Sequence, residues 1–203
     1  MIFHLGCLPV YFPFPHLYPE QYEYMKSIKK TLDDNGGHAL LEMPTGTGKT
    51  VCLLSLTTSY QSYYASDPAK KIGKIVYCTR TVPEMDSVME ELGVVMDYRA
   101  RELAISRRMS QGKSREEAEE EVNTQNHPKM GEISGYDNLG CGGTGILGLC
   151  LSSRRNMCIH EKVMRESDRE LVDNACRMMT ASWVREANEK SPGSVRTCDF
   201  FEN

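Results

Sequence analysis

Apolar residues recur with a helical period in some parts of the chain and form short unbroken runs in others. Residues 19–32 place apolar side chains three and four positions apart, and Pro19 suits a first helical turn, so this segment predicts a helix. Residues 38–43 (HALLEM) and 74–79 (KIVYCT) are apolar runs too short for helices and predict buried strands. Residues 49–64 contain no helix breaker and predict a helix between them. The order strand, loop, helix, strand is the beginning of a parallel α/β sheet.

The composition of the chain changes at Tyr98. Before this residue, Pro83 opens another predicted helix; after it, the sequence is dense in charged residues, which is typical of a solvated helical insertion. Ser114 and Glu117 have the spacing of a capping box and predict a second short helix there. Residues 126–148 are rich in glycine and polar residues, which favours a surface loop.

Length and composition favour one globular domain, because 203 residues with 40% hydrophobic content can bury a substantial core. A net charge of -4 argues against binding nucleic acid by overall charge, so any such contact requires a local patch. The apolar first twenty residues lack a basic leader and contain Pro9, Pro13, Pro15 and Pro19, so they predict neither a signal peptide nor a membrane anchor. We therefore expect a soluble, intracellular protein whose 8 cysteines are thiols, metal ligands or core residues.

A phosphate-binding loop is the strongest chemical signal in the sequence. Between the first predicted strand and the helix after it lie small and flexible residues whose backbone amides can surround one anion: Pro44, Thr45, Gly46, Thr47 and Gly48. Lys49 would then bind the β- and γ-phosphates of a nucleotide, and the Thr50 hydroxyl would ligate Mg²⁺. The usual spacing asks for glycine at position 43, where this chain has Met43. A chance Gly-Lys-Thr is the bland alternative, but the strand before the loop and the helix after it favour a functional site.

A second glycine pattern, GCGGTG at residues 140–145, has the spacing of a dinucleotide-binding loop. The segment before it is no strand, and the segment after it resembles a strand more than a helix, so the phosphate-binding context is missing. We interpret it as a flexible loop.

Five segments together resemble the XPD-type DNA helicases, the iron-sulfur superfamily-two helicases of the transcription and repair factor TFIIH. In order, they are YFPF with YPEQYEYM, LLEMPTGTGKT, VYCTRTVPEM, LSSRRNMCIH and TASWVREA. The resemblance covers nearly all of the chain except an insertion from about Arg99 to Gly145. It implies a P-loop NTPase fold of the α/β class: a partial RecA-like parallel sheet interrupted by an incomplete iron-sulfur cluster insertion. It also accommodates Met43, because the phosphate loop of this family keeps only the two later glycines.

The resemblance implies an ATP-driven motor that moves five-prime to three-prime on single-stranded DNA. Gln21 would lie at the adenine edge, where an amide can both donate and accept, and the loop from Thr45 to Thr50 would bind the phosphates of ATP and Mg²⁺. The DNA backbone would be held by a short series after the second predicted strand, Thr79, Arg80 and Thr81. Arg80 in a surface ion pair, with the threonines as turn residues, is the alternative interpretation.

The resemblance assigns three cysteines, Cys158, Cys176 and Cys198, to thiolate ligands of a 4Fe-4S cluster, which normally takes four. From spacing alone these residues fit no compact metal motif, and buried or free thiols are the alternative. A fourth ligand would lie downstream, since Cys141 and Cys150 could substitute only if their loop folds back. Arg154 and Arg155 are candidate DNA contacts at a duplex fork; a solvated basic pair is the other interpretation.

Residues 1–203 contain no Asp-Glu-Ala-His box to hold Mg²⁺ and orient the attacking water, and no second RecA-like domain. We therefore expect the chain to be the front of a helicase and inactive by itself, with residues 1–97 beginning the ATP-binding domain, 98–146 forming an insertion and 147–203 an incomplete iron-sulfur domain. The complete enzyme would act in nucleotide excision repair and transcription initiation, in the nucleus, with other TFIIH core subunits and no membrane. A naturally truncated, catalytically inactive P-loop protein acting through partners is the first alternative, and an unrelated P-loop kinase or switch is the second.

Overall fold

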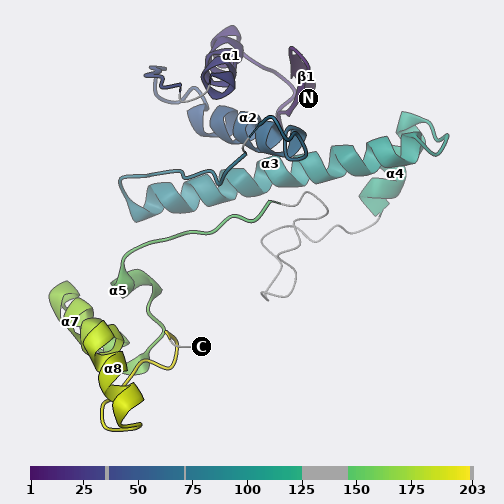
Figure 1. The fold of residues 1–203 in the computed structure, drawn as a ribbon. Coiled ribbons are helices and arrows are strands. Elements are labelled where there is room, and N and C mark those ends of the chain that lie inside the picture. Colours follow the sequence, from purple (N-terminus) through teal and green to yellow (C-terminus); the bar gives the residue numbers. More distant parts are fainter. Residues whose placement is uncertain (35–36, 71, 125–145, 202–203) are drawn as a thin grey trace. The chain divides into compact units, whose positions relative to one another are not determined.

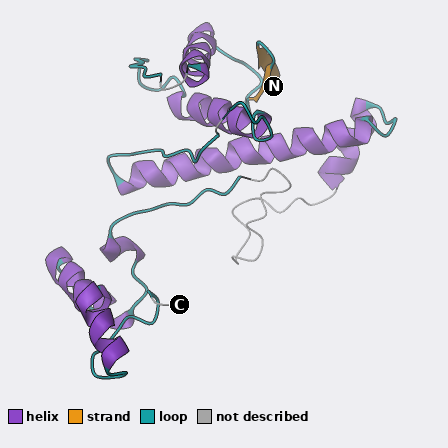
Figure 2. Ribbon diagram, viewed as in Figure 1, coloured by secondary structure: helices purple, strands orange, loops and turns teal. Residues whose placement is uncertain are grey.

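The computed structural model describes residues 1–34, 37–70, 72–124 and 146–201, most of them helical or in loops (Figures 1 and 2). Internal contacts divide the chain into two units, Met1–Gly148 and Leu149–Asn203. The glycine pattern at 140–145 and most of the predicted loop at 126–148 lie outside the described residues. Among the helices described, none is both long and apolar enough to span a membrane.

A β-hairpin that the sequence analysis did not predict begins the first unit. Strands β1 (Ile2–Leu5) and β2 (Leu8–Tyr11) pair antiparallel, with Ile2 opposite Tyr11. The turn between them begins at Gly6, whose φ of +65° is readily adopted only by glycine. Leu8 and Val10 are fully buried, so β2 packs against the helices through one face.

Two helices, both predicted from the sequence, share the core with this hairpin. Helix α1 (Pro19–Asp33) begins with proline in its first turn and buries Met25 and Ile28. Helix α2 (Lys49–Tyr63) packs against α1, β2 and the third helix, so it buries small polar residues as well as apolar ones. The main core of the unit lies among these elements and contains Leu5, Leu8, Val10, Phe12, Met25, Leu56 and Val95.

The predicted parallel sheet does not form in the described part of the chain. Residues 38–43 and 74–79 have no strand pairing, and the hairpin β1–β2 is the only sheet within the described ranges (Figure 2). Leu40 is 101% exposed and Val76 is 82% exposed, so these segments are not the buried strands we expected. A strand needs a neighbouring backbone to satisfy its amides and carbonyls, and local apolarity does not specify that neighbour. The observed fold is mixed α/β and mostly helical.

Helices α3 (Val82–Met109) and α4 (Arg115–Thr124) complete the first unit. Thr81 caps α3 by accepting a hydrogen bond from the Glu84 amide at 3.4 Å, and α3 continues without a break through residue 97. The predicted capping box before α4 is confirmed: the Ser114 amide donates to the Glu117 carboxylate at 3.0 Å, and the Glu117 amide donates to the Ser114 hydroxyl at 3.2 Å.

The described residues of the second unit, 149–201, contain four helices: α5 (Arg154–Met157), α6 (Glu161–Met164), α7 (Arg169–Thr180) and α8 (Ser182–Lys190). The side chain of Asp168 caps α7 by accepting from the amides of Glu170 and Leu171. The core of the unit is small and consists of Val163, Val172, Met179 and Cys198, with Cys158 and Ala175 packed against it.

Candidate functional site

The predicted phosphate loop lies between the extended segment 38–43 and the first turn of α2. Gly46 and Gly48 have φ values of +79° and +74°, in the left-handed region that other residues rarely adopt. A Cβ atom on Gly48 would lie 3.0 Å from Gln21 Nε2 and 3.3 Å from Val51 Cγ1. Conformation and packing therefore both favour glycine at position 48.

Gln21 braces this loop from the beginning of α1. Its Nε2 atom donates to the Thr47 carbonyl at 2.9 Å, and its Oε1 atom accepts from the Tyr18 amide at 3.0 Å. The side chain is buried, so both ends of its amide are engaged within the protein. The resemblance to XPD-type helicases implies a place for Gln21 at the adenine edge; its contacts in the structure are with Tyr18 and with Thr47 of the loop.

Lys49 folds back over the loop. Its ammonium donates to the carbonyl oxygens of Met43 at 3.0 Å and Pro44 at 2.7 Å, and the Thr47 hydroxyl donates to the same Pro44 carbonyl at 2.7 Å. Thr50 is half-buried in the first turn of α2. The lysine is thus held beside the loop by neutral acceptors, which a phosphate oxygen can replace because its negative charge adds attraction to the ammonium.

The first turn of α2 directs its amide groups toward this loop. Gly48 is the N-cap and provides no side-chain acceptor, and the first intrahelical bond runs from the Cys52 amide to the Gly48 carbonyl at 3.1 Å. The amides of residues 49–51 precede that bond, and helix geometry leaves them without an intrahelical partner. Two left-handed glycines, a lysine and this helix start are the donor set that a nucleotide polyphosphate requires, so the residues fit ATP. The Thr50 hydroxyl is suited to Mg²⁺.

A hollow of about 440 Å³ adjoins the loop. It is lined by the beginning of α1 and by the loop itself: Tyr18, Glu20, Gln21, Met43, Pro44, Gly46 and Thr47. Its volume lies within the range of small-molecule sites. The loop therefore has space beside it for more of a nucleotide than the phosphates.

The candidate DNA-binding residues Thr79, Arg80 and Thr81 precede α3. The Arg80 guanidinium forms an ion pair with Glu84 at 3.0 Å, and the Arg80 amide donates to the same carboxylate at 3.0 Å. These backbone and side-chain hydrogen bonds lower the pKa of Glu84. The Thr79 hydroxyl donates to the Thr81 carbonyl at 3.2 Å. Arg80 is nevertheless 89% exposed along its side chain, so the ion pair leaves it accessible to solvent.

The three candidate cluster ligands all belong to the second unit. Cys158 follows α5, Cys176 lies on α7, and Cys198 is buried in the C-terminal turn. Cys198 is part of the small core, and Cys158 packs against it, while Cys176 is 3.9 Å from the Thr180 hydroxyl. Within the described ranges, no three cysteine, histidine or carboxylate side chains are grouped to hold a metal ion. The cysteines as arranged do not fit a 4Fe-4S cluster.

Arg154 and Arg155 occupy the exposed first turn of α5. Arg154 forms an ion pair with Asp173 of α7 at 3.2 Å, and both side chains are about half exposed. Arg155 is exposed to solvent. One of the two candidate contacts therefore also links two helices of the unit.

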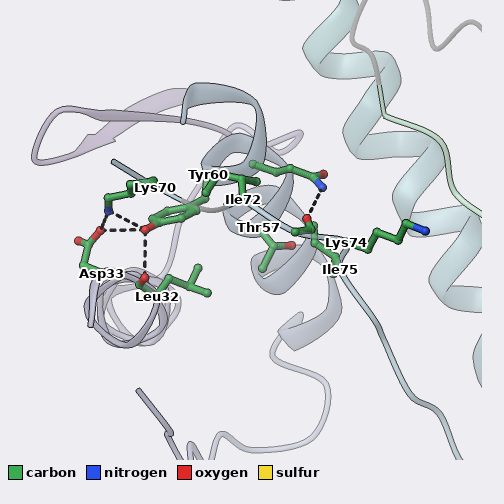
Figure 3. A pocket seen from close by; sticks show the side chains of 10 residues that line it. Leu32, Asp33, Thr57, Tyr60, Lys70, Ile72, Lys74 and Ile75 are labelled. Atoms are coloured by element: carbon green, nitrogen blue, oxygen red, sulfur yellow. Dashed lines mark hydrogen bonds and ion pairs between the residues drawn. The ribbon is translucent and has the colours of Figure 1, made fainter. Parts of the chain in front are cut away.

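A polar clamp that the sequence analysis did not predict lies at the far end of α2 (Figure 3). Lys70 donates to Asp33 at 2.5 Å and to the Tyr60 hydroxyl at 2.7 Å, and that hydroxyl is 3.1 Å from the Leu32 carbonyl. Lys29 donates to the same aspartate at 2.6 Å. The clamp joins α1 and α2 to the segment that leads toward Thr79, and it borders a hollow of about 320 Å³.

Burial opposes ionisation of Asp33, but hydrogen bonds from Lys29, Lys70 and Tyr60 outweigh it and lower the pKa of Asp33 to about 2. The Lys70 ammonium also lies 4.1 Å from the centre of the Tyr64 ring. Asp33 and Lys70 are far apart in the sequence, which is why no local pattern predicted the clamp.

Comparison with known proteins identifies the family. A family model described as DEAD_2 matches residues 77–203, more than half of the chain, and a model described as the res subunit of type III restriction enzymes matches residues 14–128. The chain belongs to the DEAD_2 family.

Within that family, the chain is a homologue of the XPD helicase subunit of general transcription and DNA repair factor IIH. It is 43% identical over 203 residues to this subunit in Arabidopsis thaliana and 40% identical over 204 residues to the XPD/RAD3 subunit in Saccharomyces cerevisiae. Both alignments include 100% of the chain and 21% of the relative, so the chain spans about a fifth of the length of these proteins. A regulator of telomere elongation helicase from Mus musculus is 26% identical over 205 residues, with 98% of the chain and 14% of the relative aligned.

Proposed function

We propose that this chain is the ATP-binding front of an ATP-dependent, five-prime to three-prime DNA helicase of the XPD type. The observation that carries the proposal is the phosphate loop, in which two left-handed glycines and Lys49 lie at the start of α2. The homology to XPD subunits supports the reaction class. The acidic box and second motor domain of such a helicase belong, in this proposal, to the rest of the complete protein.

In this mechanism, Lys49 leaves the carbonyls of Met43 and Pro44 and donates to the β- and γ-phosphates. The amides of the first turn of α2 bind the same phosphates. The Thr50 hydroxyl would hold Mg²⁺, which would offset the charge that develops during phosphoryl transfer. Gln21 holds the Thr47 carbonyl, so that the loop keeps its shape while the nucleotide is exchanged.

The complete protein provides the test of this proposal. Lys49→Ala should abolish DNA-stimulated ATP hydrolysis and leave thermal unfolding unchanged. Lys26→Ala, which removes an exposed lysine paired with Glu23, is the matched control and should retain hydrolysis. Hydrolysis at the wild-type rate in the Lys49 variant would overturn the assigned role.

For the nucleic acid, we propose that Thr79, Arg80 and Thr81 bind the backbone of single-stranded DNA and that Arg154 and Arg155 contact the duplex fork. The exposure of Arg80 supports the first assignment, because its ion pair with Glu84 is weak enough for a phosphate to replace. The segments 38–43 and 74–79 then form strands of a RecA-like parallel sheet completed elsewhere in the protein. The same proposal divides the chain into the beginning of the ATP-binding domain at residues 1–97, an insertion at 98–146 and an incomplete iron-sulfur domain at 147–203.

The remaining parts of the proposal follow from the XPD resemblance. They are a 4Fe-4S cluster on Cys158, Cys176, Cys198 and a fourth thiolate, assembly with TFIIH core subunits, a nuclear location, and roles in excision repair and transcription. For the cluster, the three thiols must come closer together than the structure shows. Iron content of the complete protein purified without oxygen tests this directly: a value near four per chain in wild type, lost in Cys176→Ser, is the expected result.

A further inference from the structure

The turn between α3 and α4 separates positive from negative charge along the chain. Residues 103–115 contain no aspartate or glutamate and include four cationic residues, Arg107, Arg108, Lys113 and Arg115. The next residues, 116–121, contain five glutamates and no cationic residue. Helix α4 is therefore a short acidic helix that directly follows a basic turn.

One carboxylate of α4 neutralises two of these cations. Glu121 Oε2 accepts from Arg108 Nε at 3.1 Å, and its other oxygen accepts from the Lys113 ammonium. These two partners, Lys113 first, lower the pKa of Glu121 in spite of its partial burial. Two cations converging on the two oxygens of one anion is an arrangement that also binds a phosphate.

Helix α4 is anchored to α3 at its first residue, where Arg115 forms an ion pair at 3.2 Å with Glu102, whose side chain is 6% exposed. The buried side chains of α4 are Ala118 and Val122, which pack with Ile105 of α3 in a cluster separate from the main core. The Glu121 side chain is 43% exposed and Lys113 is 38% exposed, so their ion pair adds little stability. Release of the Glu121 side chain from its two cations is therefore inexpensive compared with unfolding of the unit, and it leaves the Arg115–Glu102 pair intact.

We propose that α4 is an acidic cover over a phosphate-binding site for single-stranded nucleic acid, in which Arg108 and Lys113 exchange the Glu121 carboxylate for backbone phosphates. Exposed Arg107 lies beside this site and extends it along the chain. The choice of nucleic acid as the polyanion rests on the proposed function, whereas the cover itself rests on the ion pairs. The site does not use Arg80 or the nucleotide loop.

Binding of a fluorescent single-stranded oligonucleotide to the complete protein tests the cover, with Glu121→Gln compared to Glu120→Gln. The two variants change net charge equally, but the Glu120 side chain is exposed and forms no ion pair in the described part of the chain. Glu121→Gln should tighten binding by about three- to tenfold at low salt and steepen the dependence of log Kd on log salt by about 0.7 to 1.4, the effect of one or two added phosphate contacts. Glu120→Gln should change Kd less than twofold. Equal effects of the two variants, or no effect of either, would overturn the proposal.

A third variant tests whether the tighter oligonucleotide binding arises at this site. Adding Lys113→Gln to Glu121→Gln should remove most of the tightening, and a gain that persists would overturn the assignment to Lys113. ATP hydrolysis in the same preparations separates the two hypotheses. Loss of the Glu121 effect with normal DNA-stimulated hydrolysis refutes the cover alone, and absence of hydrolysis with an intact Glu121 effect refutes the helicase proposal alone.

Discussion

The side-chain amide of Gln21 faces Gly48 at the start of α2, so that a Cβ atom on the glycine would lie 3.0 Å from Gln21 Nε2. The same amide donates to the carbonyl of Thr47, the residue before this glycine, at 2.9 Å. The phosphate loop is therefore shaped by a side chain from α1 as well as by its own glycines. Displacement of Gln21 should alter the loop without removing any residue from it.

Comparison of Gly48→Ala with Gly46→Ala separates the contribution of Gln21 to the shape of the loop from that of the glycine backbone. Both glycines have positive φ, but the structure provides open space around a Cβ on Gly46 and crowding around one on Gly48. Each alanine should lose about 1–2 kcal/mol through backbone strain, and Gly48→Ala should weaken ATP binding further because it displaces Gln21. The measurement is the Kd of a fluorescent ATP analogue for the complete protein. Equal affinities of the two variants would contradict the bracing role of Gln21.

The clamp at Asp33 predicts a pH dependence of stability. The folded-state pKa of Asp33, about 2, is lower than the ordinary value of 3.8, so the stability it contributes is present above pH 4 and is lost as pH falls through 2. The pKa of Lys70 is raised, so the stability that Lys70 contributes is lost only at strongly alkaline pH. Asp33→Asn should therefore destabilise the protein at pH 6 and have much less effect near pH 2. Urea unfolding at both pH values is the measurement; a pH-independent difference would count against the clamp.

The burial of Arg99 leads us to expect that a methionine variant at this position is more stable than an alanine variant. Its guanidinium is buried between α2 and α3, donates to the Thr58 carbonyl at 3.0 Å, and lies 5.1 Å from the centre of the Tyr11 ring. Burial lowers the pKa of Arg99, and no carboxylate in the described ranges forms an ion pair with it. Arg99→Met keeps most of the volume and removes a buried charge, so it should be neutral or stabilising. Arg99→Ala should cost about 2–3 kcal/mol by leaving a cavity. Chemical denaturation of both variants checks this order, and a methionine variant less stable than the alanine variant would contradict it.

Charged substitutions in the extended segments 38–43 and 74–79 should raise the solubility of the isolated chain but lower the stability of the complete protein. Leu40 and Val76 are almost fully exposed here, and exposed apolar backbone without a strand partner promotes aggregation. Leu40→Lys with Val76→Lys should raise the soluble fraction of the isolated 203-residue chain. In the complete protein the same pair should reduce stability, because the proposed sheet buries both residues. Soluble expression together with thermal unfolding measures both effects, and tolerance of the lysines in the complete protein would argue against the sheet.

Helices α1 to α4 and the capping box of α4 could be predicted because their signals are local. Pro19 begins α1, Pro83 lies in the first turn of α3, and Ser114 with Glu117 forms the capping box of α4. The hairpin β1–β2 also had a local signal, the alternation of buried residues after Gly6, but the prolines around it obscured the pattern.

Pairings between distant residues could not be predicted in this way. The two apolar runs at 38–43 and 74–79 indicate a need for burial but do not specify a partner strand, so the parallel sheet was predicted without evidence of pairing. The contacts of Lys70 with Asp33 and of Arg99 with Thr58 join segments 37 and 41 residues apart, beyond any helical or strand period. The loop at residues 44–48 and the start of α2 were predictable in position, whereas the contacts of Gln21 behind the loop required the structure. Phosphate binding by this loop stays a prediction.

Binding of ATP to the chain itself tests the central claim most directly. Equilibrium titration with a fluorescent ATP analogue and Mg²⁺, on wild type, Lys49→Ala and Lys26→Ala, requires neither DNA nor the remainder of the protein. We expect saturable binding by the wild type. The Lys49 variant should bind about ten- to a hundredfold more weakly, because a charged contact to phosphate is removed, and the Lys26 variant should bind like the wild type. Equal binding by both variants would mean that the loop at the start of α2 is not the nucleotide site.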